Sequence, residues 1–141
     1  MRIAICDDEK NIRELIGDKV AKQYPEAEIV FFSSGEELFL SDKSIDILLL
    51  DIQMSGRNGM DTARELRKKD KNVILIFVTA VEEYVFQAFD VGAFNYIVKP
   101  IDDAKFTDVL HRAVDELSLQ NRDEKEPEER YLIIYSGGAH I

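Results

Sequence analysis

Acidic residues follow two of the short apolar runs in this chain, and a hydroxyl and an ammonium group follow two others. Asp7 and Asp8 come after the first run and Asp51 after the third, whereas Thr79 follows the fourth run and Lys99 the fifth. Carboxylates that lie close together repel one another, which raises their affinity for protons unless a cation lies among them. If the fold brings these residues together, we therefore expect a cation to take part in their chemistry.

The cation that suits such a cluster is Mg²⁺, because it prefers carboxylate oxygens, keeps several waters and often bridges carboxylates to a phosphoryl oxygen. With Mg²⁺ and the Lys99 ammonium close by, the charge that develops in phosphoryl transfer would be offset, and an aspartate could act as a covalent nucleophile. The Thr79 hydroxyl could donate a hydrogen bond to the phosphoryl oxygens. The residue types thus predict Mg²⁺-dependent phosphoryl transfer.

Five short apolar runs alternate with amphipathic stretches and would supply the elements that position these residues. Three runs are nearly continuous in Ile, Leu and Val, which is typical of parallel strands covered by helices on both faces. The best match is an α/β fold, a doubly wound, flavodoxin-like parallel sheet of five strands in the order 2-1-3-4-5 with five helices. The predicted strands are Arg2 to Cys6, Glu28 to Phe32, Asp46 to Leu50, Val73 to Val78 and Phe94 to Val98.

Helices are predicted between and after these runs from apolar residues at helical spacing. Ser34 and Glu37 fit a capping box and predict a helix start, and two further helices are expected over Gly59 to Lys68 and Glu83 to Val91. The residues expected to face the core are Ile12, Leu15, Ile16 and Val20, then Met60, Ala63 and Leu66, then Val85, Ala88 and Phe89, and last Phe106, Val109, Leu110, Ala113, Val114 and Leu117.

Composition and charge exclude several classes of protein. The chain has 141 residues, enough for one domain and an appendage, and no apolar run approaches the length of about 20 residues that spans a bilayer. We expect a cytoplasmic protein that does not enter a membrane. The net charge of the chain, −10, disfavours binding to the negatively charged backbone of a nucleic acid. The single cysteine, Cys6, cannot form an internal disulfide, and two distant histidines make no zinc site.

In this order, the motifs resemble the response-regulator receiver family of two-component phosphorelay signalling over roughly residues 1–121. No single motif is specific, but their combination is. The matching pieces are Asp7-Asp8, Asp51-Ile52-Gln53-Met54, Gly59, Val78-Thr79-Ala80 and Lys99-Pro100.

The resemblance implies a role for each matching residue. Asp51 would accept the phosphoryl group and, with Asp8 and the backbone carbonyl of Gln53, would bind Mg²⁺, while Asp7 would act on the metal through water. Thr79 and Lys99 would hold the phosphoryl group.

Two further positions bear on the resemblance. Tyr96 matches an aromatic residue that moves with the Thr79 hydroxyl when the family's members are activated. Ser55 departs from the family, since many members have proline there; we expect this to loosen the loop slightly and to leave the assignment of the site unchanged.

The resemblance also implies partners and an arrangement of domains. A sensor histidine kinase would phosphorylate Asp51, and phosphorylation would favour a homodimer; the chain would be no enzyme beyond slow self-phosphorylation and self-dephosphorylation. The segment from Glu83 to Tyr96 resembles the LytTR-type branch, whose receivers precede a β-rich DNA-binding domain. We therefore predict a receiver over residues 1–121, an acidic linker over 122–130, and over 131–141 the first strand of a truncated effector domain that would regulate transcription and carry all DNA binding.

Three alternatives stay open at this point. An aspartyl-phosphate phosphohydrolase of the haloacid-dehalogenase type uses similar residues, but its nucleophile belongs in an Asp-x-Asp motif on the first strand. A flavin-binding domain of the same topology would offer neutral amides to a phosphate, and here Glu9 and two aspartates would repel it. A non-phosphorylated interaction module that keeps the fold is the third alternative, and the complete acidic pocket argues against it.

Overall fold

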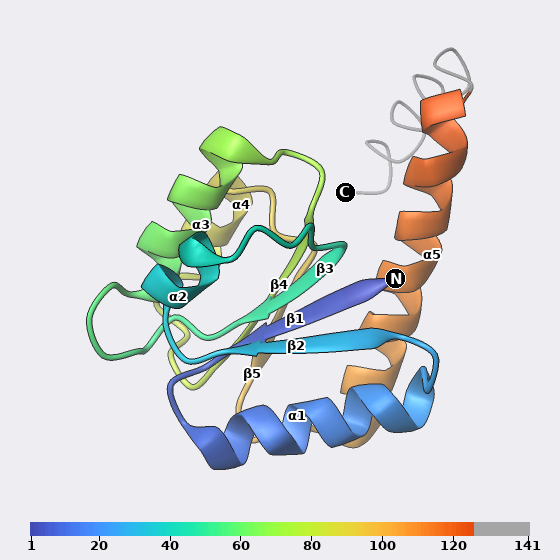
Figure 1. Cartoon of the computed structure of the whole chain (residues 1–141). Coiled ribbons are helices and arrows are strands. Elements are labelled where there is room, and N and C mark those ends of the chain that lie inside the picture. The colour runs from blue at the N-terminus through green and yellow to red at the C-terminus, as the bar shows by residue number, and fades with distance from the viewer. Residues whose placement is uncertain (126–141) are drawn as a thin grey trace.

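The fold is a five-stranded parallel sheet between two layers of helices (Figure 1). This computed structural model describes residues 1–125, with side chains described to residue 121. The strands lie in the order β2-β1-β3-β4-β5, which confirms the predicted fold class. The elements are β1 (Arg2–Cys6), α1 (Lys10–Gln23), β2 (Glu28–Phe32), α2 (Gly35–Leu40), β3 (Ile47–Leu50), α3 (Gly59–Lys69), β4 (Ile74–Thr79), α4 (Val85–Asp90), β5 (Asn95–Val98) and α5 (Asp103–Lys125).

Each face of the sheet has its own apolar core because successive side chains of a strand point to opposite faces. Ile3 and Ile5 of β1 pack in one core with residues of α1 and α5, whereas Ala4 and Cys6 pack in the other with residues of α2, α3 and α4. The two groups of helices cover opposite faces of the sheet (Figure 1). Every residue of β3 and β4 is buried, as the continuous apolar runs predicted. The edge strands β2 and β5 are only partly buried.

Three residues that were predicted to face the core lie at the surface instead. Leu15 is 46% exposed, because α1 packs against the sheet through the neighbouring Ile16. Val85 and Phe89 are 39% and 70% exposed. Helix α4 has only six residues and buries only Ala88, so its larger side chains remain outside.

The helix starts and ends agree with the predictions only in part. The Ser34 hydroxyl accepts a hydrogen bond from the Glu37 amide at 3.0 Å, as expected. The Glu37 carboxylate, however, accepts from the amide and hydroxyl of Ser33, at 3.2 and 2.9 Å, and not from Ser34. Helix α5 continues to Lys125, into the stretch assigned to the acidic linker. The rest of that linker and the strand predicted over 131–141 lie outside the described residues, so the domain boundary stays a prediction.

Among the helices of residues 1–125, none combines the length and the apolar character that crossing a bilayer requires.

Helix α3 begins in direct contact with the end of β3. The Gly59 amide donates to the Ile52 carbonyl at 2.7 Å. A Cβ at Gly59 would lie 2.0 Å from the backbone oxygen of Asp51 and 2.7 Å from the Cα of Ile52. No side chain fits at that separation, so glycine is required for α3 to start where it does.

We expect Gly59→Ala to lower the free energy of unfolding by about 1–3 kcal/mol, the usual cost of forcing atoms into a packed core. Urea unfolding followed by circular dichroism measures this. Lys68→Ala, on the exposed face of the same helix, is the control and should change stability by less than about 0.5 kcal/mol. Equal stability of the two variants would contradict the close approach at Gly59.

Candidate functional site

The sheet's hydrogen bonding continues one residue beyond the strands and fixes the backbone of the candidate residues. The Asp7 amide donates to the Phe32 carbonyl at 3.1 Å, and the Asp51 amide donates to the Cys6 carbonyl at 3.0 Å. At the ends of β4 and β5, the Lys99 amide likewise donates to the Thr79 carbonyl at 2.8 Å. The polar residues therefore lie together at the end of the sheet where the strands have their carboxyl ends.

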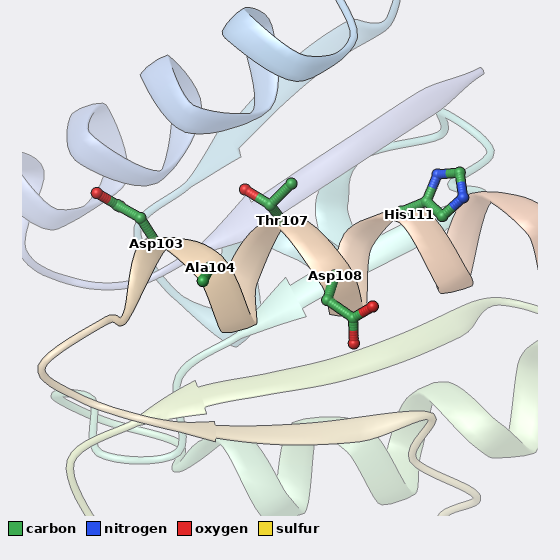
Figure 2. Close-up of a pocket in the computed structure, with 5 residues that line it drawn as sticks. All are labelled: Asp103, Ala104, Thr107, Asp108 and His111. Carbon is green, nitrogen blue, oxygen red and sulfur yellow. The ribbon is translucent and has the colours of Figure 1, made fainter.

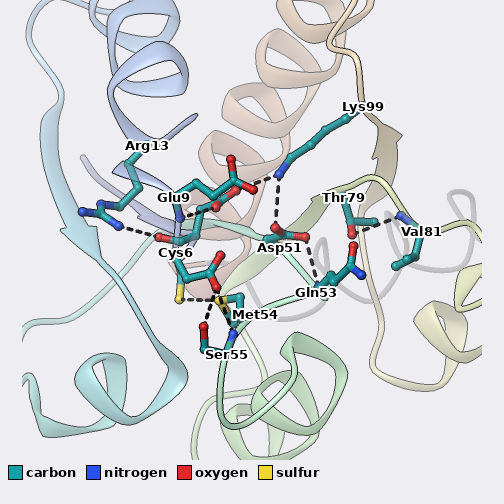
Figure 3. A network of polar contacts seen from close by, with 12 residues as sticks. Cys6, Glu9, Arg13, Asp51, Gln53, Met54, Ser55, Thr79, Val81 and Lys99 are labelled. Carbon is teal, nitrogen blue, oxygen red and sulfur yellow. Dashed lines mark hydrogen bonds and ion pairs between the residues drawn. The ribbon is translucent and has the colours of Figure 1, made fainter. Parts of the chain in front are cut away.

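Three carboxylates meet at this edge. Asp7, Asp8 and Asp51 each offer an oxygen, and these oxygens lie within 4.8 Å of one another. Asp7 is 1% exposed and Asp51 5%. The Lys99 ammonium donates to Asp7 Oδ2 at 2.9 Å and to Asp51 Oδ2 at 3.1 Å (Figure 3). The structure thus brings together four of the residues that the sequence predicted.

The electrostatics of the cluster follow from burial and from this bridge. Burial raises the pKa of Asp7, although hydrogen bonds from the Glu9 amide and from Lys99 act against it. Burial would lower the pKa of Lys99, but its hydrogen bond to Asp7 and the charge of Asp51 outweigh that effect, and the pKa lies above its ordinary value. Three carboxylates and one ammonium leave an excess of two negative charges, which a divalent cation with oxygen ligands would match.

Asp8 has a partner that the sequence did not reveal. The amide and the hydroxyl of Ser55 both donate to Asp8 Oδ2, each at 2.9 Å. The bond from the Ser55 amide is the main reason that the pKa of Asp8 is lowered. We expected Ser55 to leave the assignment of the site unchanged; the structure adds that it contacts one of the three carboxylates. Only the path of the loop between β3 and α3 could have shown this, and no motif encodes that path.

The predicted switch residues are joined through Val81. The Thr79 hydroxyl is buried and accepts from the Val81 amide at 3.4 Å (Figure 3). The Tyr96 hydroxyl donates to the Val81 carbonyl. The Tyr96 ring packs against Phe77 with centroids 5.8 Å apart, and burial raises the pKa of its hydroxyl. Sequence reasoning named Thr79 and Tyr96 but missed Val81, because its contribution comes from the backbone.

Gln53 and Cys6 complete the surroundings of Asp51. The Gln53 amide donates to Asp51 Oδ1 at 3.1 Å, whereas its carbonyl as a metal ligand stays a prediction. Cys6 is buried, and burial raises its thiol pKa to about 12. The thiol is therefore protonated at neutral pH and is no nucleophile.

A shallow groove elsewhere on the surface carries none of these residues. It is lined by one face of α5 near its start, with Asp103, Ala104, Thr107, Asp108 and His111 (Figure 2). Helix α1 lies beside it, where Lys19 forms an ion pair with Asp103 and the Gln23 side chain donates to the Thr107 carbonyl at 3.0 Å. The groove is therefore separate from the acidic cluster.

Lys99 should stabilise the fold, because it is the ammonium that bridges two buried carboxylates. We expect Lys99→Met to lower the free energy of unfolding by about 1–3 kcal/mol in a buffer without divalent cations, as for a buried group that loses its partner. Urea unfolding measures this, with Lys10→Met as the control, since Lys10 is exposed on α1. A Lys99→Met variant as stable as the Lys10 variant would mean that the bridge contributes nothing to stability.

Comparisons with known proteins agree with this geometry. Residues 3–111 match the family model of the response regulator receiver domain. The chain is 32% identical to the sensory transduction protein LytT of Bacillus subtilis (strain 168), over 79% of this chain and 47% of that protein. It is also 32% identical to LytT of Enterococcus faecalis, over 95% of this chain and 57% of that protein. These relatives confirm the predicted resemblance to the LytTR-type branch, and the chain spans about half their length.

The structural comparison points the same way. The response regulator protein TrrA from Thermotoga maritima, solved in complex with Mg²⁺–BeF, is 32% identical with a TM-score of 0.71, over 79% of this chain and 97% of that chain. Sequence, topology and the polar edge of the sheet lead to one assignment. The chain belongs to the response regulator receiver family of two-component signalling.

Proposed function

We propose that this receiver domain accepts a phosphoryl group on Asp51 in a Mg²⁺-dependent reaction and passes the signal on through a change of conformation. The observation that carries the proposal is the Lys99 ammonium, which donates to Asp7 and Asp51 at 2.9 and 3.1 Å beside Asp8. The solved relative TrrA, in complex with Mg²⁺–BeF, supports it further.

The reaction is an in-line displacement at phosphorus. An oxygen of the Asp51 carboxylate forms the new P–O bond, and the bond from phosphorus to the donor breaks, with its electron pair leaving on the donor. Asp7, Asp8 and Asp51 would hold Mg²⁺, which offsets the charge on the phosphoryl oxygens. Lys99 would contact the same oxygens. The backbone hydrogen bond from Gln53 to Asp51 Oδ1 orients the carboxylate.

Thr79 is the residue through which we expect the signal to leave the site. Its hydroxyl now accepts from the Val81 amide at 3.4 Å, a long bond that would break easily if Thr79 turned to donate its proton to a phosphoryl oxygen. Reorientation of Thr79 would take this partner from Val81, which is also held by the Tyr96 hydroxyl. The segment that leads into α4 would therefore rearrange.

The partners follow from the family and stay proposals. A sensor histidine kinase would supply the phosphoryl group from a phosphohistidine, and the imidazole nitrogen would be the leaving atom. Phosphorylation would favour a homodimer. We propose that residues 131–141 begin a DNA-binding effector domain; the Enterococcus faecalis relative, which aligns over 95% of this chain and is longer, leaves room for one.

The direct test is mass spectrometry after incubation with acetyl phosphate and Mg²⁺. We expect one phosphoryl group on Asp51, no labelling of Asp51→Asn, and no labelling of the wild type in EDTA, because the excess negative charge of the cluster must be offset before a phosphoryl group approaches. Asp61→Asn, an exposed acid on α3, is the control and should be labelled normally. Labelling that persists in EDTA or in Asp51→Asn would remove the proposal.

A second test separates phosphorylation from switching. We expect Thr79→Ala still to be labelled on Asp51 but to lose most of the phosphorylation-dependent change in amide hydrogen exchange over residues 81–90, because the hydroxyl that links the site to Val81 is gone. Thr107→Ala, on the exposed face of α5, serves as the control and should respond like the wild type. If Thr79→Ala shows the full change, the signal leaves the site by another route.

A further inference from the structure

The loop between β3 and α3 is tied to the site at several points. At its start, the Gln53 amide donates to Asp51 Oδ1 at 3.1 Å, and at its end the Gly59 amide donates to the Ile52 carbonyl at 2.7 Å. Between them, Ser55 donates twice to Asp8. The loop thus joins an acid at the end of β3 to an acid at the end of β1.

The geometry at Asp8 is specific. Both bonds from Ser55 fall on the same oxygen, Oδ2, each at 2.9 Å, one from the amide and one from the hydroxyl. Two donors on one oxygen fix the rotation of the carboxylate and leave Oδ1 free of Ser55. Asp8 is only partly buried, in contrast to Asp7 and Asp51, so packing holds its side chain less firmly. Ser55 therefore supplies a constraint that burial supplies to the other two acids.

A second contact holds the loop on its far side. The Arg57 guanidinium lies over the ring of Phe39 in α2, 5.4 Å from its centroid, which is within the range of a cation–π interaction. Ser55 thus lies between Asp51, which is buried, and Arg57, which contacts α2. This makes its two bonds to Asp8 easier to maintain, because less of the loop must be ordered to form them.

We propose that Ser55 is a positioning residue for the cation site: it holds the Asp8 carboxylate beside Asp7 and Asp51 and thereby sets the affinity of the cluster for Mg²⁺. The inference rests on the proposed function, in which these three acids hold the metal. Hydrogen bonds to a ligating carboxylate orient it before the cation arrives, and removing them weakens metal binding. A proline at this position would lack both donors, so the sequence at residue 55 would tune metal affinity.

The test is a titration of the chain with Mg²⁺ alone, followed by the amide signals of the site in NMR spectra; the chain has no tryptophan to report by fluorescence. We expect the dissociation constant to rise about fivefold in Ser55→Ala, which loses the hydroxyl but keeps the amide. Ser55→Pro, which loses both donors, should raise it further. Ser55→Thr keeps both donors and should stay within about twofold of the wild type.

Two controls separate positioning from a general loss of structure. Ser118→Ala, which removes an exposed hydroxyl on α5, should bind Mg²⁺ like the wild type. Urea unfolding without Mg²⁺ shows which variants fold; if Ser55→Pro does not, Ser55→Ala and Ser55→Thr still decide the matter. A loss of affinity that threonine fails to restore would mean that the hydroxyl is not the active group and would overturn the proposal.

The outcomes also distinguish this inference from the proposed function. Unchanged Mg²⁺ affinity in Ser55→Ala and Ser55→Pro, with Asp51 still labelled by acetyl phosphate, would overturn the role of Ser55 alone. Tighter binding in Ser55→Ala would show that Ser55 competes with the cation for Asp8, and would also overturn it. Weaker binding in the variants, with no labelling of wild-type Asp51, would leave the role of Ser55 standing and remove the proposed function. A wild type that does not bind Mg²⁺ would overturn both.

Discussion

Asp7 and Asp51 are buried carboxylates at the ends of neighbouring strands, and much of the surrounding structure offsets their charge. Leaving such groups without partners costs on the order of several kcal/mol each. Lys99 reaches them from the end of β5, although β4 lies between β5 and β3 in the sheet. A lysine has the length for this, and its ammonium can donate to two acceptors at once. The cluster is therefore stable enough to exist in the folded chain, yet it keeps an excess of negative charge that favours a divalent cation.

The sheet makes this arrangement possible because it fixes the backbone on which each group stands. Parallel strands place all their carboxyl ends at one edge, and the hydrogen bonds from Asp7 to Phe32 and from Asp51 to Cys6 extend the pairing just past the strands. Because Gly59 has no Cβ, helix α3 can begin in contact with the backbone of Asp51. The backbones of Asp7, Asp51 and Lys99 thus pair within the sheet, whereas Val81, through which we expect the signal to leave, belongs to a loop.

Sequence reasoning could predict the parts of the molecule that depend on regular periodicity. The continuous apolar runs identified β3 and β4, and parallel topology then placed Asp7, Asp51, Thr79 and Lys99 at one edge. It could not predict which residues of a helix face the core when this depends on how the helix packs against the sheet. Leu15 and Phe89 have helical spacing that suits a core position, yet α1 packs through Ile16 and the short α4 through Ala88. The contact between Ser55 and Asp8 could not be predicted, because it depends on the path of a loop whose sequence has no periodic pattern.

Helix α4 is tied to α3 by two arginines, and this bears on how a signal would leave the site: the Arg64 guanidinium donates to the Gln87 side chain at 2.5 Å. The Arg67 guanidinium donates to the carbonyls of Val91 and Gly92, at 2.6 and 3.1 Å, and so ties the end of α4 to α3. The amino end follows Tyr84, whose side chain makes no capping bond, and a loop in which Val81 depends on the Thr79 and Tyr96 hydroxyls. A rearrangement at Thr79 would therefore reach the segment that precedes α4 first, while Arg64 and Arg67 hold the helix to α3. Any movement of the helix would reorient Phe86 and Phe89, which are 81% and 70% exposed.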